Sequence, residues 1–429
     1  MNLWADLENN RLSPHDTMEQ GRRQRARRPT EQTILSSLRE WLLQDYAASY
    51  CRSLGATRIY RRCYWIDGLG VDSKITGAAQ ISIEPEQQNG SRTGKGRKKG
   101  AAPVVPPMLQ PVVTLSQALE QESKPITLCG LMTEAGSSKR RSAREKKNGV
   151  VREIALPKES GIVQASWLEV APLLLKEIEQ SPAIFLLNPF GPATFTQDNL
   201  TALYQRTVPT ELCLLLSYKQ IEACLLLARR SSEQAATLTG LLRTDRWKAL
   251  PTAEEEREQA VDGFVTLFIA GMQRHFQFPV QSITLPMQTR PAVVEEAPYL
   301  LLFATRRQDS LLSMNDAVYR EYRRVNEQSH QGVLGAEWFA AQQRERADED
   351  LEQLYQRTLQ QGRAQRIRRW PDLRQQLLLA NFGRCSVYDY DMIMRKLLLN
   401  KEVRCEWRRA PIDPAEDRIP GSDDTLLWR

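Results

Sequence analysis

The 429-residue chain has little of what a metal or disulfide site needs. It contains only three histidines, and no two of its seven cysteines stand in CxxC spacing. A His/Cys zinc site needs clustered ligands, so we predict no metal site. Scattered single cysteines are typical of a reducing compartment. We therefore expect a cytoplasmic protein.

Long apolar runs are also missing. No run reaches the roughly 18 residues that a membrane-spanning helix needs, and the N-terminus lacks the charged start and apolar stretch of a signal peptide. We therefore expect no membrane partner. Hydrophobic residues make up 41% of the chain and charged ones 26%, which excludes wholesale disorder and a disulfide scaffold. The length suits roughly two to three domains.

Basic charge is confined to four windows. They cover residues 22–28, 92–99, 139–147 and 363–409 and together carry +22, which leaves −15 for the rest of a chain whose net charge is +7. This distribution favours an anionic partner such as nucleic acid. The alternative is that the first three tracts only keep flexible segments solvated.

Short apolar runs alternate with helical patterns between residues 31 and 330. This alternation predicts an α/β domain with a mostly parallel sheet covered by helices and an antiparallel edge pair, a Rossmann-like methyltransferase sheet. Residues 1–30 are predicted to be a disordered basic arm, and the Gly/Lys-rich and basic stretches near 84–110 and 134–149 to be disordered insertions. The expected strands are Arg58–Asp67, Pro125–Met132, Ala183–Leu187, Glu211–Ser217, Val280–Pro286 and Tyr299–Ala304.

The last part of the chain predicts a second module. Residues 337–366 are charged and helix-favouring, which indicates a helical connector. From 367 to 429 the order is an amphipathic helix, Gly383, a second helix over Tyr388–Leu399, and two short strand candidates. That order is typical of a winged helix-turn-helix module.

Two turns at predicted strand ends are candidate functional sites. Asp67, Gly68 and Gly70 follow the first strand, where a glycine turn lets S-adenosylmethionine approach the backbone of a class I methyltransferase. Asn188, Pro189 and Phe190 follow a buried strand, as a related (Asp/Asn)-Pro-Pro-aromatic turn does in amino-methyltransferases, although here Phe190 replaces the second Pro and Gly191 the aromatic residue. There Asn188 and Pro189 would accept hydrogen bonds from a target amine, and Phe190 would stack on the base. Either sequence is also compatible with an ordinary turn.

Four segments together resemble the three-Cys-motif partner (TcmP) family. They carry YRRCYWIDGLG, FLLNPFGP, GLLRTDRW, and YLLLFATRR with SLLSMNDAVY, and the similarity covers roughly residues 32–325. The family is methyltransferase-like and is encoded beside a radical-SAM-like protein that carries the three cysteines. The resemblance therefore implies S-adenosylmethionine as a cofactor, that neighbour as a possible partner, and a bacterial protein.

The resemblance maps the cofactor turn onto Asp67, Gly68 and Gly70 and the second loop onto Asn188–Gly191. The sequence departs from the family in its shortened glycine loop and in Asn188, which stands where Asp is usual. Glu134 is the only nearby candidate for the acidic residue that holds the ribose hydroxyls. These departures favour a competing hypothesis, in which the fold is retained as the scaffold of a catalytically inactive nucleic-acid-binding or assembly subunit.

The C-terminal block provides the candidate nucleic-acid contacts. Its basic residues precede the first helix, lie on the second, or lie in the proposed wing, and neutralising several phosphates would make binding depend steeply on salt. Such modules also bind proteins, and this alternative stays open. The candidate contact residues are Arg366, Arg368, Arg369, Arg395, Lys396, Arg404, Arg408 and Arg409.

Overall fold

The computed structural model describes residues 29–71, 106–134, 156–157, 159–190, 197–290, 293–331, 335–408 and 418–429. Most of the predicted arm and insertions, together with Gly191 and Arg409, lie outside these residues. The chain divides into two compact units. One comprises Leu42–Ile283 with Pro298–Ser313, and the other Met1–Trp41, Thr284–Ala297 and Met314–Arg429.

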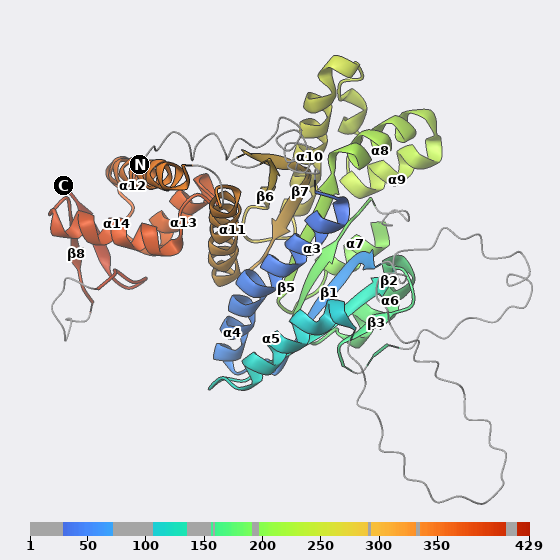
Figure 1. The fold of residues 1–429 in the computed structure, drawn as a ribbon, viewed down its shortest axis with the longest axis horizontal. Helices are drawn as coiled ribbons and strands as arrows, with labels where there is room; N and C mark the ends of the chain where they lie inside the picture. Colours follow the sequence, from blue (N-terminus) through green and yellow to red (C-terminus); the bar gives the residue numbers. More distant parts are fainter. Residues whose placement is uncertain are drawn as a thin grey trace, which may run out of the picture. The chain divides into compact units, whose positions relative to one another are not determined.

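A mostly parallel sheet of seven strands has the order β3-β2-β1-β4-β5-β7-β6 (Figure 1). It lies mainly in the first unit, whereas residues 284–290 of β6 and 293–297 of β7 belong to the second. The pairs β1–β2, β2–β3, β1–β4 and β4–β5 are parallel, and β7 is antiparallel to β5. The predicted mixed α/β fold with a mostly parallel sheet is thus confirmed. The strands are β1 Arg62–Val71, β2 Thr127–Glu134, β3 Gly161–Val163, β4 Ala183–Leu187, β5 Thr210–Ser217, β6 Gln281–Arg290 and β7 Val293–Ala304.

Helices cover both faces of this sheet. Every residue of β4 and β5 is buried, as expected for strands with helices above and below. One face packs on α6, α7, α8 and α10, and Tyr46 meets Phe303 on the other. The helices are η1 Leu42–Ala47, α4 Ala48–Thr57, η2 Pro107–Leu109, α5 Gln110–Glu120, α6 Trp167–Glu177, α7 Gln197–Tyr204, α8 Tyr218–Arg230, α9 Ser232–Leu242, η4 Arg246–Ala249, η5 Glu254–Glu256 and α10 Arg257–Gln273.

Two local differences from the sequence expectations bear on the site. The first strand continues through both glycines to Val71 and does not stop at Asp67. The region predicted as an insertion near 84–110 already contains the short helix η2 and the start of α5. Pro107 begins η2 because proline fits the first turn of a helix. The strand β3 and the helices α5, α8 and α9 were not predicted.

The second unit contains the C-terminal helices and a two-stranded sheet. Asn315, in the first half of α11, donates from its side chain to the carbonyl of Cys385 and accepts from the backbone N–H of Gly383, both of which lie between α13 and α14. Gly383 has a φ of +74°, a conformation that favours glycine. The elements are α3 Glu31–Trp41, α11 Gln308–Ser329 (which starts in the first unit), α12 Ala336–Gln365, α13 Trp370–Ala380, α14 Val387–Leu399, β8 Val403–Glu406 and β9 Thr425–Trp428.

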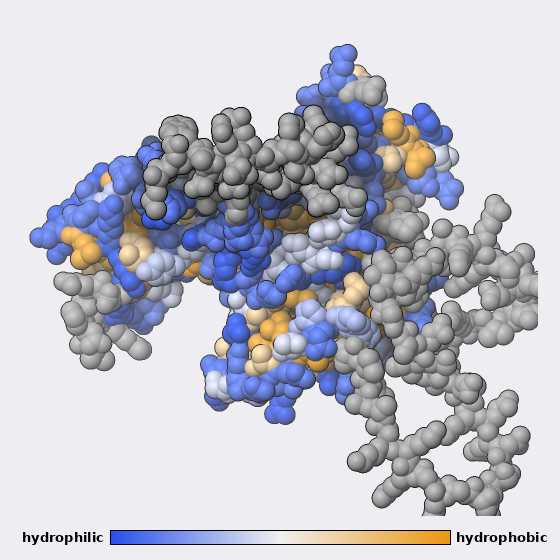
Figure 2. Space-filling model, in the orientation of Figure 1, coloured by the Kyte–Doolittle hydropathy of each residue, from blue (hydrophilic) through white to orange (hydrophobic). Residues whose placement is uncertain are grey.

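Hydrophilic side chains cover most of the described surface in the view of Figure 2. Large hydrophobic side chains that remain exposed include Leu226 and Leu227 of α8 and Tyr388 and Leu399 of α14. None of the helices in the described part of the chain is long and apolar enough to span a bilayer.

Candidate functional site

The glycine segment after Asp67 forms a bulge inside β1. Asp67 pairs with Met132 of β2, and the next paired position is Val71 with Glu134, so the register shifts across Gly68–Gly70. Gly70 has a φ of +88°, which a residue with a side chain rarely adopts. The predicted glycine turn is therefore a bulge at the carboxyl end of the strand.

Asp67 stabilises this bulge through hydrogen bonds. Its side chain is completely buried, and its Oδ1 accepts a hydrogen bond of 3.0 Å from the backbone N–H of Leu69. Thr133 of β2 donates to the Asp67 carbonyl at 3.4 Å. These bonds satisfy groups that the bulge takes out of the β-ladder.

Gly68 is enclosed by neighbouring side chains. A Cβ atom at this position would collide with Leu187 at the end of β4 and lie 3.3 Å from Trp167 at the start of α6. The absence of a side chain therefore lets these two elements approach the strand. Trp167 had not been predicted as part of this region.

The backbone of Glu134 lies beside the bulge. It is the last residue of β2 and pairs with Val71. The structure therefore brings the predicted acidic residue to the same edge as Gly70. Its side chain lies outside the described atoms.

The Asn188 turn reaches the same edge because β4 is the other neighbour of β1. Leu186 pairs with Asp67, and Asn188 follows two residues later. The Asn188 Oδ1 accepts a 2.8 Å hydrogen bond from the N–H of Phe190, and its Nδ2 donates to Gln220 Oε1 at 2.9 Å. Asn188 thus both stabilises its own turn and contacts α8.

Phe190 points into the apolar core. Its side chain is 7% exposed, and its ring centroid lies 5.4 Å from that of Phe264 and 6.5 Å from that of Phe268 in α10. In this conformation the ring packs against protein, where the sequence interpretation had it stack on a base. Pro189 is buried as well.

Gln220 is a residue of this edge that the sequence interpretation missed. It lies three residues beyond Ser217, where the parallel strand β5 ends beside β4. Carboxyl ends of adjacent parallel strands meet at one edge. The end of the predicted strand Glu211–Ser217 was therefore a usable signal for a polar partner of Asn188.

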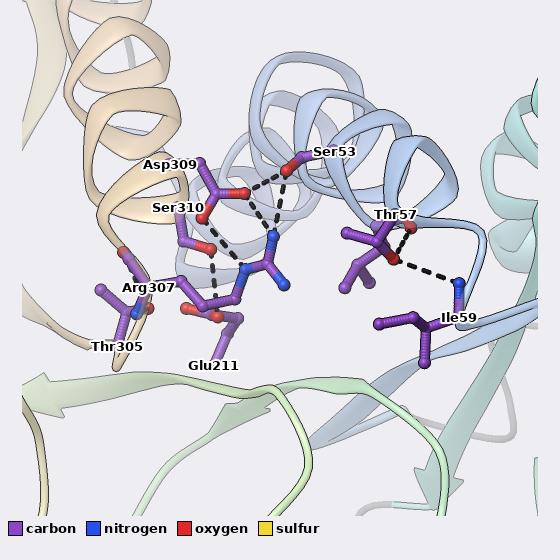
Figure 3. Close-up of polar contacts among 9 residues, drawn as sticks. Ser53, Thr57, Ile59, Glu211, Thr305, Arg307, Asp309 and Ser310 are labelled. Atoms are coloured by element: carbon purple, nitrogen blue, oxygen red, sulfur yellow. Dashed lines mark hydrogen bonds and ion pairs between the residues drawn. The ribbon is translucent and has the colours of Figure 1, made fainter. Parts of the chain in front are cut away.

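A second polar cluster lies at the opposite edge, at the amino end of β5 (Figure 3). Glu211 is fully buried, and its Oε1 accepts a 3.1 Å hydrogen bond from Ser310 at the start of α11. Arg307 donates from Nε to Asp309 Oδ1 at 3.0 Å and from Nη2 to Ser53 of α4 at 3.1 Å. The sequence interpretation did not identify this cluster.

The pKa values of the two acids in this cluster, Glu211 and Asp309, are shifted in opposite directions. Burial raises the pKa of Glu211 to about 7, against the neighbouring hydroxyls of Thr305, Tyr46 and Ser310 and the charge of Arg307, which lower it. Burial also raises the pKa of Asp309, but the hydrogen bonds and charge of Arg307 outweigh it and hold that pKa below its usual range. Arg307 is thus paired with the more exposed acid.

The basic residues of the C-terminal module differ in their surroundings. Arg366, Arg368, Arg369 and Arg404 are exposed. Lys396 lies 3.6 Å from a carboxylate oxygen of Glu352 in α12. The Arg395 side chain donates to Met392 at 3.7 Å, and the Arg408 side chain pairs with Asp423 at 3.2 Å.

Metal ligands do not cluster in the described residues: no group of three or more His, Cys, Asp or Glu side chains there could hold a metal ion. All seven cysteines are free thiols. Comparison with known proteins adds no assignment, since no family model, curated protein or solved structure matches this chain.

Proposed function

We propose that the protein is an S-adenosylmethionine-dependent methyltransferase-like protein of the three-Cys-motif partner type that acts on or with nucleic acid. The carrying observation is the sheet: strand order β3-β2-β1-β4-β5-β7-β6, with β7 antiparallel to β5, is the order of class I methyltransferases. In such open sheets the ligand site lies at the carboxyl ends of the strands. Asp67–Gly70, Glu134 and Asn188–Phe190 all reach that edge.

The cofactor side of this edge fits a nucleoside-containing cofactor. Asp67 holds the glycine bulge in shape, Gly70 has the backbone conformation of a tight glycine turn, and Glu134 ends the adjacent strand. The backbone at Leu69–Gly70 would contact the cofactor, and the Glu134 carboxylate would accept from ribose hydroxyls. S-adenosylmethionine would supply the methyl group.

The Asn188 turn, where the methyl-accepting amine would bind, favours the second candidate. This is a nucleic-acid-binding subunit that retains the fold without catalysis. Both polar groups of Asn188 have partners within the protein, and Phe190 packs on Phe264 and Phe268. An amine held for transfer would have to share the Asn188 oxygen with the Phe190 N–H. This packing accounts for a stable turn without any substrate.

Titration calorimetry with S-adenosylmethionine separates the two candidates. Under the first, the protein releases or takes up heat on binding, and its melting temperature rises with cofactor concentration. Glu134→Gln should weaken binding by about tenfold, since one charge-assisted hydrogen bond is lost. Glu122→Gln, on a partly exposed residue that pairs with Arg52, is the matched control and should bind like the wild type.

Absence of heat and of a thermal shift at about 1 mM cofactor would exclude the enzyme and leave the scaffold. Nucleic-acid binding is tested separately by mobility shift across a salt series, because phosphate contacts weaken as salt rises. Co-purification of the radical-SAM-like neighbour tests the partner that the family resemblance implies.

A further inference from the structure

The C-terminal module contains a third segment beside its two-stranded sheet, residues 366–369 between α12 and α13. The N–H of Leu426 in β9 donates to the carbonyl of Arg368 at 2.7 Å, and the indole N–H of Trp428 donates to the carbonyl of Ile367 at 2.7 Å. The segment between α12 and α13 therefore runs along β9. Because β9 pairs with β8 through its other edge, it lies between this segment and β8.

Trp428 fixes this arrangement against α12. A side chain at Gly362 would collide with the Trp428 ring, so the ring lies directly on the helix backbone. The indole hydrogen bond and this close packing hold β9 in place beside Ile367. Residues 366–369, β9 and β8 are thus joined by specific contacts, and we call them the strip.

Four arginines on this strip project cationic side chains into solvent. Arg366, Arg368 and Arg369 lie on the added segment, and Arg404 lies on β8 opposite Leu427. None of the four forms an ion pair with a carboxylate of the described residues. By contrast, the nearby Arg363 and Arg408 are paired with Glu402 and Asp423.

The helix α14, which would be the reading helix of a winged helix-turn-helix protein, has a different surface. Its exposed side chains include Tyr388 at 65%, Met392 at 40% and Leu399 at 60%. Lys396 is drawn to α12, where its Nζ lies 4.8 Å from the Tyr355 ring centroid and 3.6 Å from Glu352.

The carboxylates of α14 also have hydrogen-bond partners within the protein. Asp389 accepts from the backbone and hydroxyl of Ser386, and Asp391 accepts from Arg374 and Trp370. Bases are read by arginine, lysine, amide and carboxylate groups, and those of α14 are largely occupied. Apolar and aromatic side chains dominate what is left.

We propose that this module binds the phosphate backbone of nucleic acid through Arg366, Arg368, Arg369 and Arg404, without base reading by α14. The inference rests on the proposed nucleic-acid function and specifies how the nucleic acid is bound. Phosphate contacts position a protein without selecting sequence. Binding is therefore sequence-independent and steeply dependent on salt.

The experiment measures fluorescence anisotropy of labelled short duplexes of two unrelated sequences with the full-length chain, from about 50 to about 200 mM salt. Wild type should bind both sequences with similar affinity. The variant with Arg366, Arg368, Arg369 and Arg404 all changed to Gln should reduce the slope of log affinity against log salt by about 3 to 4, roughly 0.9 per lost contact. Arg395→Gln with Lys396→Gln is the matched control and should leave the slope unchanged.

Single variants guard against a folding defect in the fourfold variant: Arg404→Gln and Arg368→Gln should each lower the slope by about 0.9. If wild type binds but only the Arg395/Lys396 variant lowers the slope, or if the two sequences differ strongly in affinity, the inferred mode is overturned and the nucleic-acid function stands. If wild type binds neither duplex at the lowest salt, the function itself fails. Binding only to vesicles of anionic lipid also contradicts the proposal.

Discussion

The two edges of the seven-stranded sheet use polar side chains in opposite ways. At the carboxyl edge, Asp67 and Asn188 each accept a hydrogen bond from a backbone N–H two residues later, 3.0 Å from Leu69 and 2.8 Å from Phe190. At the amino edge of β5, Arg307 pairs with Asp309, and the buried Glu211 accepts a hydrogen bond from Ser310. The first edge stabilises turns, whereas the second holds an acid that titrates near neutral pH.

The turn bonds of Asp67 and Asn188 are local, whereas the bond of Glu211 is long-range. An aspartate or asparagine that binds its own chain two residues on satisfies a turn with a residue nearby in sequence. The partners of Glu211 come from distant parts of the chain, since Ser310 lies 99 residues away. Such a buried network depends on the whole unit being folded.

Phe190→Ala should produce the largest effect on the carboxyl edge. Removing a ring that packs on Phe264 and Phe268 leaves a cavity, so we expect the free energy of unfolding to fall by about 3 to 5 kcal/mol. Urea denaturation followed by tryptophan fluorescence measures this loss. Phe190→Leu, which keeps much of the apolar volume, should cost clearly less. A loss under about 1 kcal/mol for the alanine variant would mean that the ring is not part of the core.

Glu211→Gln should change how stability depends on pH. The folded pKa of Glu211, about 7, lies above that of an unfolded glutamate, about 4.3. Its proton therefore favours the folded state below about pH 4, and this contribution declines with rising pH and is gone above about pH 7. The wild type should lose about 4 kcal/mol across this range.

The glutamine variant mimics the protonated acid and should lack this decline. It should match the wild type below about pH 4 and exceed its free energy of unfolding near pH 8, as determined by denaturation at a series of pH values. Glu233→Gln, on an exposed residue of α9, is the control and should follow the wild-type curve. An unchanged decline in Glu211→Gln would assign the pH dependence to other groups.

Changes at the Asn188 turn should have the smallest effects. Asn188→Asp keeps the oxygen that accepts from Phe190 but loses the donor to Gln220, so it should cost about 1 kcal/mol, as Gln220→Ala should. Asn188→Ala loses both bonds and should cost about 2 kcal/mol. Denaturation of these variants and of the double mutant gives the coupling between Asn188 and Gln220. Additive losses would mean that their hydrogen bond does not contribute.

Several elements could be predicted from the sequence because their signals are local. The strand Ala183–Leu187 was predicted with its observed bounds, since an uninterrupted apolar run lies between Pro182 and Asn188-Pro189. The helix predicted over 337–366 is found as α12, because its residues favour helix throughout. Glycines at 68 and 70 were taken as the end of β1, and here the β2 partner extended the strand to Val71.

The candidate site was predictable in location and only partly in role. Strand ends of a parallel sheet meet at one edge, so Asp67, Glu134 and Asn188 were brought together as their strands implied. The direction of the Phe190 ring was not predictable, because it depends on Phe264 and Phe268 in a helix more than 70 residues later. Likewise, sequence alone did not distinguish Lys396, which pairs with Glu352 of α12, from Arg404, which is exposed.

Alternation of apolar runs and helical patterns was enough to establish an α/β chain with a mostly parallel sheet and a helical C-terminal part, because secondary structure follows residue periodicity and turn residues. Only the tertiary structure decided which polar side chains are buried or paired and which are exposed. It buried Glu211 beside Arg307, placed Phe190 in the core, paired Lys396 with Glu352 and left Arg368 and Arg404 exposed. The physical reason is that burial and pairing set the charge and availability of a side chain, and both depend on residues far away in the sequence.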